Sequence, residues 1–191
     1  MAQIRSSVKY KKIKDAVKAL SEQYSVKVGL LASQGATEEV SKDMDLAGLG
    51  AIHEFGATIN VTDKMRGFFR HQFGINLKSS TKTIVIPTRS FLEMPLTTQT
   101  KKLEKYMLES FGSEGVEAIE YWIAEKGDLE SIAIMLGAAA VRLVNEAFDT
   151  SGFGNWPPNS PITIAQKGSA MPLIDTGKLR QKITYEVSKN V

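Results

Sequence analysis

The stretch DLESIAIMLGAAAVRLVNEAF, residues 128–148, contains the longest apolar run of the chain and decides its fold. Eight of its apolar side chains recur at helical spacing on one stripe: Leu129, Ile132, Ala133, Leu136, Ala140, Leu143, Val144 and Ala147. Positions beside that stripe are apolar as well, so we expect a core helix that is buried on more than one side. The uninterrupted run, Ile132 to Val141, is about half of the roughly 20 residues that cross a bilayer, so we expect no membrane span.

Strands and further helices are predicted on both sides of this helix. Tyr24–Ala32 alternates and then becomes continuously apolar, which is typical of a central strand. Three more strands are expected at 58–62, 83–87 and 182–187. Further helices are expected at 8–20, 46–55, 95–110, 115–126 and 162–167. Asp45 and Ser160 are placed to cap two of these helices at their N-termini.

The pattern as a whole predicts one α+β domain that covers residues 1–191. Its sheet should be small, mixed or antiparallel, and packed by two to four helices, among them 95–110 and 128–148. Residues 149–172 hold four of the chain's six prolines and are expected to form an extended segment.

A projecting arm is predicted at residues 63–82, between two of the expected strands. Met65, Phe68, Phe69 and Phe73 follow helical spacing there, which fits a short amphipathic helix or the tip of a long hairpin. An arm cannot bury three phenylalanines by itself, so it is expected to contact a neighbouring subunit. The candidate interface residues are Lys64, Met65, Arg66, Phe68, Phe69, Arg70 and Phe73.

Trp156, followed by two prolines, has two interpretations that the sequence leaves equally open. It could be an aromatic platform for a partner, because aromatic side chains are enriched at interface anchors. It could instead hold its loop against the core. We include Trp156 among the candidate interface residues.

The composition excludes several kinds of chemistry. The chain has no cysteine, which removes disulfides, thiolate catalysis and iron–sulfur ligation. Of its two histidines, His53 precedes Glu54 as in the zinc-protease motif, but Ala57 stands where the second histidine is required. The net charge of +3 is mild. We expect no catalytic site, no metal and no cofactor, and hence a protein that is not an enzyme.

The triplet Asp175-Thr176-Gly177 matches the catalytic sequence of retroviral-type aspartic proteases. Those enzymes need two carboxylates that share a proton, whereas this chain has one such triplet with only 14 residues after it. We therefore interpret Asp175 or Thr176 as a structural cap. Its side-chain oxygen would accept a hydrogen bond from a helix that starts at Gly177 to Leu179.

Three blocks, taken in order, resemble one protein family. They are AIHEFGATINVTDKMRGFFR at 51–70, IPTRSFLEMPL at 86–96 and GNWPPNSPITIAQKGSAMPLIDTGKLRQKITYEV at 154–187. Together they resemble the virion-morphogenesis, or tail-completion, proteins of Mu-like tailed bacteriophages. Thr88 and Ser90 depart from the family's usual I-P-A-R-P-F-L.

This resemblance implies a structural virion protein that completes the tail and joins it to the head. The implied partners are further copies in a six-fold ring and the neighbouring neck, connector and tail-terminator or tail-tube proteins. The implied location is the virion neck or tail, after synthesis in the bacterial cytoplasm. Alternatives are a tail-terminator ring, an assembly factor, a DNA-binding protein and an Asp175-dependent hydrolase. Non-specific DNA contact would use the lysines of residues 8–20, or Lys64, Arg66 and Arg70.

Overall fold

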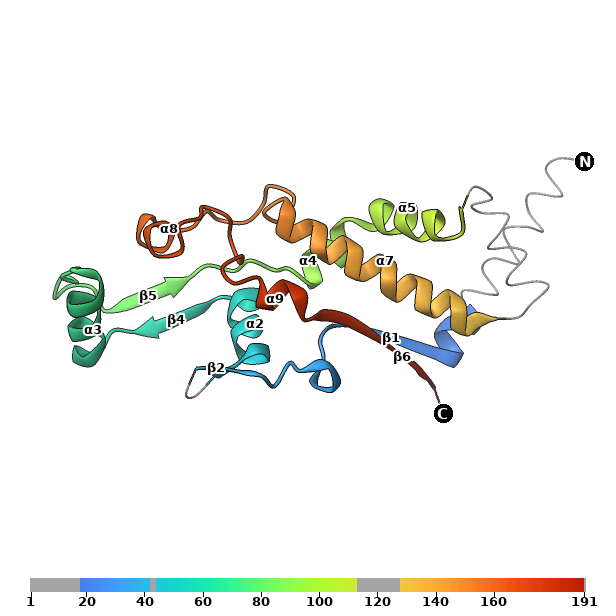
Figure 1. Cartoon of the computed structure of the whole chain (residues 1–191), viewed down its shortest axis with the longest axis horizontal. Coiled ribbons are helices and arrows are strands. Elements are labelled where there is room, and N and C mark those ends of the chain that lie inside the picture. Colours follow the sequence, from blue (N-terminus) through green and yellow to red (C-terminus); the bar gives the residue numbers. More distant parts are fainter. Residues whose placement is uncertain (1–17, 42–43, 113–127, 191) are drawn as a thin grey trace, which may run out of the picture.

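The computed structural model describes residues 18–41, 44–112 and 128–190, which form an α+β fold. The molecule is elongated, with a helical body at one end and an arm at the other (Figure 1). The predicted helix at 115–126 lies outside the described residues. The predicted helix at 8–20 lies mostly outside them, and residues 18–23 are helical.

Helix α7 (Leu129–Asp149) is the predicted core helix. Asp128 caps it by accepting a hydrogen bond from the Ser131 N–H at 3.0 Å. Its buried residues lie on more than one side, as expected: Ile132, Ala133, Gly137, Ala139, Ala140, Leu143, Val144, Ala147 and Phe148. The helix is long and apolar enough to cross a membrane by those criteria alone, but half of the relevant stretch is buried inside this fold. Core helices of soluble proteins share that combination.

One face of α7 covers an antiparallel ribbon of β1 (Tyr24–Leu30) and β6 (Ile183–Lys189). Val28 lies opposite Tyr185, while Lys27 and Glu186 face each other and are exposed. The strand predicted at 182–187 is confirmed as β6. The expectation that β1 is a central strand is wrong, because β6 is its only partner strand within the described residues. Helices, not further strands, pack against its apolar end, where Leu30 adjoins Gly50.

Helices α4 (Glu93–Thr98) and α5 (Thr100–Ser110) replace the single helix expected at 95–110. The break lies at Gln99, whose ψ of 36° is not helical. Just before it, the Thr97 and Thr98 hydroxyls donate to the carbonyls of Glu93 and Met94, each at 2.7 Å. Such bonds back to the preceding turn bend helices.

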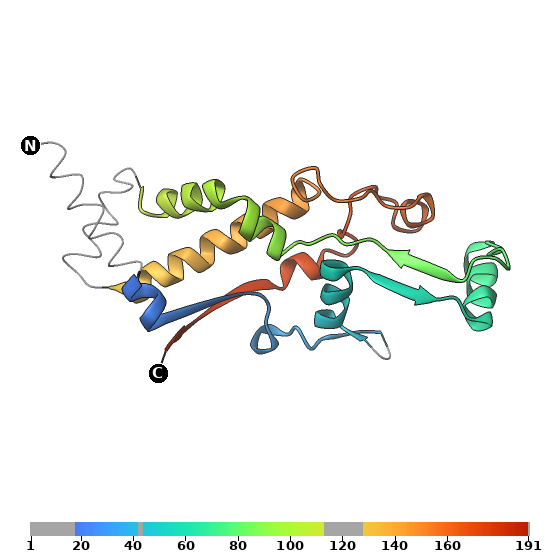
Figure 2. The same cartoon turned by 180° about the vertical axis from the view of Figure 1, so that it is seen from behind.

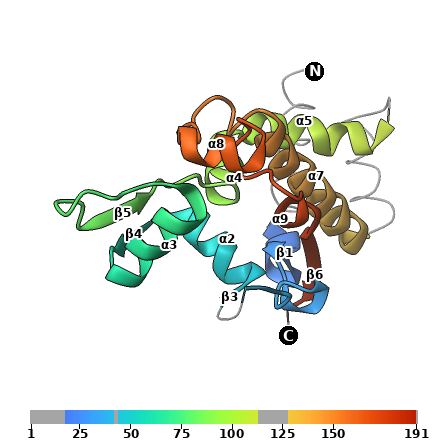
Figure 3. The ribbon, with the colours of Figure 1, turned by 60° about the vertical axis from the view of Figure 1, so that its left-hand side comes forward.

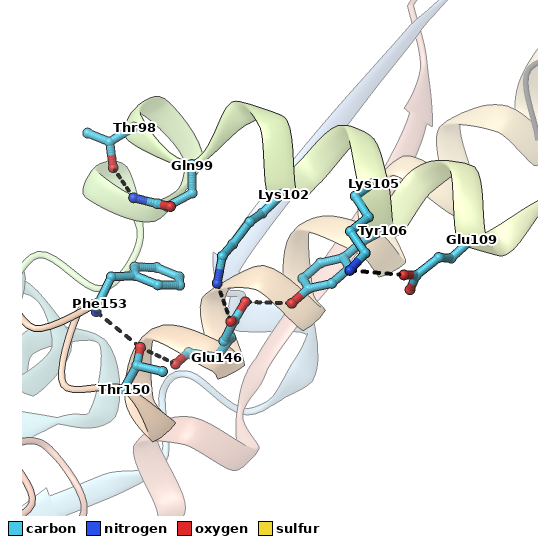
Figure 4. A network of polar contacts seen from close by, with 9 residues as sticks. All are labelled: Thr98, Gln99, Lys102, Lys105, Tyr106, Glu109, Glu146, Thr150 and Phe153. Carbon is cyan, nitrogen blue, oxygen red and sulfur yellow. Dashed lines mark hydrogen bonds and ion pairs between the residues drawn. The ribbon is translucent and has the colours of Figure 1, made fainter.

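The contact between α5 and α7 is centred on the Glu146 carboxylate (Figure 4). It accepts hydrogen bonds from Lys102 and, at 2.6 Å, from the Tyr106 hydroxyl. Burial alone would raise the pKa of Glu146, but the bonds from Lys102 and Tyr106 outweigh it and hold that pKa below its ordinary value. Lys102 also lies 4.7 Å from the centre of the Phe153 ring. These contacts hold α5 against α7.

Short elements connect β1 to the arm. They are the 3₁₀ turn η1 (Ala32–Gln34), the paired strands β2 (Glu39–Ser41) and β3 (Met44–Asp45), and helix α2 (Leu46–Phe55). Helix α2 has the predicted bounds and the predicted cap, since Asp45 accepts from the Gly48 N–H at 2.7 Å. The chain then turns at Gly56, which has a φ of 76°.

The arm consists of β4 (Ala57–Asn60), α3 (Asp63–Phe73) and β5 (Thr83–Ile86). The two strands pair antiparallel, with Thr58 opposite Val85, and α3 lies at their far end. Both predicted alternatives therefore hold, because a helix forms the tip of a long hairpin. Figure 3 shows this arm extending away from α7 and the β1–β6 ribbon.

The extended segment at 149–172 contains helix α8 (Pro161–Lys167), which Ser160 caps as predicted through the Thr163 N–H at 3.2 Å. Asn159 is buried and fixes the segment by donating to the carbonyls of Ala170 and Met171. The chain then enters the short helix α9 (Lys178–Gln181), which leads into β6.

Candidate functional site

The three sequence blocks that carry the family resemblance meet at one junction beside the base of the arm. Glu54, on α2 in the first block, is only 6% exposed. Its carboxylate accepts four hydrogen bonds from the second block: from the Ser90 hydroxyl at 2.6 Å, and from the backbone N–H groups of Phe91, Leu92 and Glu93 at 2.7–3.0 Å. Glu54 thus caps α4 from another element, where the helix dipole also favours a negative charge.

Arg89 joins the second block to the third. Its side chain is 6% exposed and donates to the carbonyls of Pro157 at 2.8 Å and Pro158 at 2.9 Å. Its backbone N–H donates to the His53 carbonyl at 2.8 Å. Burial lowers the pKa of Arg89 from its ordinary value. The guanidinium therefore cross-links loops that are far apart in the sequence.

Trp156 belongs to this junction and to the core. Its indole Nε1 donates to the Ser90 carbonyl at 3.0 Å, and its ring meets Phe148 edge-on with centroids 5.6 Å apart. Phe148 in turn contacts Phe91, and all three rings are buried. Of the two interpretations that the sequence left open for Trp156, its burial and its contacts fit the core one.

The junction fixes the place where the arm leaves the body. The Thr88 hydroxyl donates to the Phe55 carbonyl at 3.0 Å. A Cβ on Gly56 would lie 2.8 Å from the Thr88 Oγ1 and 3.0 Å from the Ile86 carbonyl oxygen. The two strands of the arm therefore start in close contact, held by the same backbone segment that Glu54 and Arg89 organise.

His53 is the histidine of the junction, and it makes the stability of the fold depend on pH near neutrality. Its Nδ1 is buried and has no hydrogen-bond partner within the described residues. Burial lowers the pKa of His53, and the positive charges of Arg89 and Lys167 lower it further. The folded protein therefore keeps this imidazole neutral.

We expect the free energy of unfolding to fall as the pH is lowered from 7.5 to 5.5. The unfolded chain takes up a proton on His53 near pH 6.5, whereas the folded chain resists it until a lower pH. Stability is therefore lost on acidification, with a slope of up to about 1.4 kcal/mol per pH unit. His53→Gln should remove this part of the slope in urea titrations, whereas His71→Gln, at the exposed arm tip, should keep it. If the free energy of unfolding changed equally with pH in the wild type and in His53→Gln, His53 would not be the group responsible.

The arm tip holds the predicted phenylalanine cluster. Phe68, Phe69 and Phe73 pack edge to face, with centroids 5.4–6.2 Å apart. The structure confirms that these side chains come together. None of residues 57–86 is buried, and Phe68 and Val85 remain 56% and 65% exposed.

The tip is ordered by its own contacts. Arg66 donates to the carbonyls of Leu77, Lys78 and Thr81 at 2.7–3.1 Å, which closes the return loop onto α3. Thr62 caps the start of α3, and Gly74 ends it in the left-handed conformation. Arg66 therefore has a structural role inside the arm, unlike Lys64 and Arg70, which are exposed.

Of the two residues predicted to cap α9, Asp175 is wrong, and Thr176 makes a long contact with the first residue of the helix. Helix α9 begins after Gly177, which has a φ of 79°, and no side chain caps it. Asp175 is exposed, and the Thr176 Oγ1 lies 3.5 Å from the Lys178 N–H, at the outer limit of a hydrogen bond. The left-handed turn at Gly177 directs the chain into α9, and Thr176 adds only a long side-chain contact.

A hollow of about 500 Å³ lies between α5 and α7, and charged side chains line it. Each of these charges has a partner: Arg142 pairs with Glu109 and Glu146 with Lys102, both just outside the hollow. Asp149 bonds to Arg180 at 2.7 Å, and Arg142 lies over the Tyr106 ring at 3.8 Å. Within the described residues, no group of three or more His, Cys, Asp and Glu side chains could hold a metal ion.

Sequence reasoning missed the roles of Glu54 and Arg89. Both are charged residues close to large apolar side chains, in the motifs HEFG and IPTRSFL. Charged side chains at such positions are usually paired when buried, which is the signal that could have identified them.

No known protein family, curated protein or solved structure gives a significant match to this chain.

Proposed function

We propose that this protein is a structural component of a tailed-bacteriophage virion that completes the tail and joins it to the head. It would act in the neck as a ring of identical subunits and contact the neighbouring connector and tail-terminator or tail-tube proteins. One observation carries the proposal. The three blocks that resemble tail-completion proteins converge on a single junction, and that junction holds the base of an uncovered arm.

The chemistry of the junction favours a structural role over catalysis. Glu54 and Arg89, its buried charged groups, use their polar atoms on backbone and hydroxyl partners within the fold. A catalytic group needs a reacting atom within reach, and these two are already occupied. Asp175, the one residue suggested by a protease-like sequence, is exposed and lies outside the junction.

The arm supplies the means of assembly in this proposal. Exposed phenylalanine and valine side chains on a projecting element are typical of surfaces that become covered by another protein. The tip is also ordered before any contact, since Arg66 and the caps of α3 fix it. A preorganised element loses less conformational entropy when it docks.

Deletion of the gene from its phage should yield separate heads and tails in negative-stain electron microscopy, and wild-type protein supplied in trans should restore joined particles. The matched control supplies Asp175→Asn, which should restore them equally well because the residue is exposed. Tails of abnormal length would instead favour a tail terminator. Intact infectious particles without the gene would contradict the proposal.

Two rival functions give different results with the purified protein. Salt-sensitive binding of free DNA, lost in a Lys64→Glu and Arg70→Glu double variant, would favour a DNA-binding role. Loss of function in Asp175→Asn with an unchanged fold would favour hydrolysis.

A further inference from the structure

The arm and the body carry opposite charge. Residues 57–86 contain five lysine and arginine residues and one aspartate, a formal charge of +4. Residues 1–17 contain the same numbers and also carry +4. Because the whole chain carries +3, the remaining residues carry −5, of which residues 113–127, outside the described part of the chain, account for −3.

Most of the arm's charge is unpaired. Within the described residues, four of its five cations take part in no ion pair: Lys64, Arg70, Lys78 and Lys82. All four side chains are exposed. The fifth cation, Arg66, is fixed to carbonyl groups of the return loop. The arm therefore presents a net positive surface that the described residues leave unneutralised.

Unpaired carboxylates lie at the opposite end of the molecule. Glu104 on α5 and Glu130 in the first turn of α7 are exposed, and neither forms an ion pair with another described residue. The exposed Lys101 beside Glu104 is also unpaired among the described residues, so these three side chains together carry −1. Figures 1 and 2 both show α5 and the start of α7 far from α3 along the long axis. Among the described residues, the long axis thus runs from a positive, apolar tip to an end where unpaired carboxylates outnumber unpaired lysines.

The arm also lacks cover for its apolar surface. An isolated two-stranded ribbon is at best marginally stable in water, and β4 and β5 pair only with each other within the described residues. Ile59 and Val85 on the ribbon, Phe68 at the tip and Phe55 at the base are among the exposed large apolar side chains. The apolar area of the arm therefore favours a partner surface, and its positive charge favours an acidic one.

We propose that this partner is a second copy of the chain, and that the arm of one copy docks head to tail against the α5–α7 end of the next. The arrangement rests on the proposed function in one respect, since a head-to-tail contact that closes on itself builds the ring. Charge decides between this contact and an arm-to-arm contact. Two arms of +4 repel, whereas an arm and the carboxylates of Glu104 and Glu130 attract.

A charge-swap experiment tests the contact. Lys64→Glu with Arg70→Glu on the arm should weaken self-association about tenfold or more at low salt, and so should Glu104→Lys with Glu130→Lys. The four substitutions combined should restore it. The matched control, Lys27→Glu with Lys189→Glu, changes the net charge as much as the arm variant but adds its negative charge on the β1–β6 ribbon, which packs against α7, so it should not weaken association. Sedimentation velocity at about 0.05 M and 0.5 M salt measures each variant.

The possible results separate this inference from the proposed function. Restored association in the combined variant supports the contact, even if gene deletion leaves heads and tails joined. A wild-type chain that remains monomeric at high concentration overturns the contact. Rings that form equally well from the arm variant also overturn it, but they leave the neck proposal standing.

Discussion

Replacing Glu54 by alanine is expected to lower the free energy of unfolding by roughly 3–5 kcal/mol, because several buried donors lose their only acceptor. The carboxylate accepts from one hydroxyl and three backbone N–H groups at the start of α4. Alanine would leave those donors without partners in a region that water reaches poorly. Thermal and urea unfolding, followed by circular dichroism, would measure the loss.

Two further variants separate the carboxylate's role from a general effect of substitution. Glu54→Gln keeps the shape but replaces one acceptor oxygen by a donor, so it should also be destabilising, though less than alanine. Glu93→Ala removes an exposed glutamate on α4 and should change stability little. Equal stability of Glu54→Ala and Glu93→Ala would show that the junction does not depend on this carboxylate.

The junction also explains why the loss of the Glu54 hydrogen bonds should change the position of the arm. The chain passes directly from Glu54 through Gly56 into β4, and from β5 through Thr88 and Arg89 back to the residues that Glu54 binds. The arm makes no buried contact of its own. Its direction is therefore set at the base, and disorder in the junction would disorder the surface proposed to bind the next subunit.

Local features of the fold were predictable from the sequence because their causes lie within a few residues. The bounds of α2 follow from Asp45 and Gly56, and those of α8 from Ser160 and Gly168. The apolar stripe of α7 likewise needs no distant partner to be recognised. In each case the residue that ends or starts the helix acts on its own neighbours.

Features that depend on distant partners were not predictable in the same way. Glu54 acts on residues 36 to 39 positions away, and Arg89 on carbonyls 68 and 69 positions away. The cluster of phenylalanines in the arm was found because its members are close in sequence. The positions of Trp156 and β1 depend on packing against elements that are distant in the sequence. Hydrophobic periodicity does not predict where those elements lie.

The Asp175 error has a different cause. The residue type and its position before a short helix fitted a cap, but the backbone adopts a left-handed turn one step later. Glycine reaches that conformation without strain, so the turn at Gly177 needs no side-chain acceptor. The glycine of the Asp-Thr-Gly triplet, and not its aspartate, is the residue that the local structure requires.

Gly137→Ala is expected to destabilise the body by about 1–3 kcal/mol, although alanine is normally the better residue in a helix. Gly137 lies in the middle of α7, where the helix crosses β6. A Cβ at this position would come within 2.2 Å of the Tyr185 ring, which would have to move. Urea unfolding would show a lower midpoint with an unchanged slope.

The matched control is Gly67→Ala, in the middle of α3, where an added Cβ meets nothing within 4 Å. Both glycines have ordinary helical backbone angles, so neither substitution forces a left-handed conformation. Gly67→Ala should leave the unfolding of the body unchanged and favour the arm helix by up to about 1 kcal/mol. If both variants were as stable as wild type, α7 could not pack on β6 as closely as described. Opposite effects would show that the close contact of the Tyr185 ring with the α7 backbone, and not helix propensity, requires glycine at position 137.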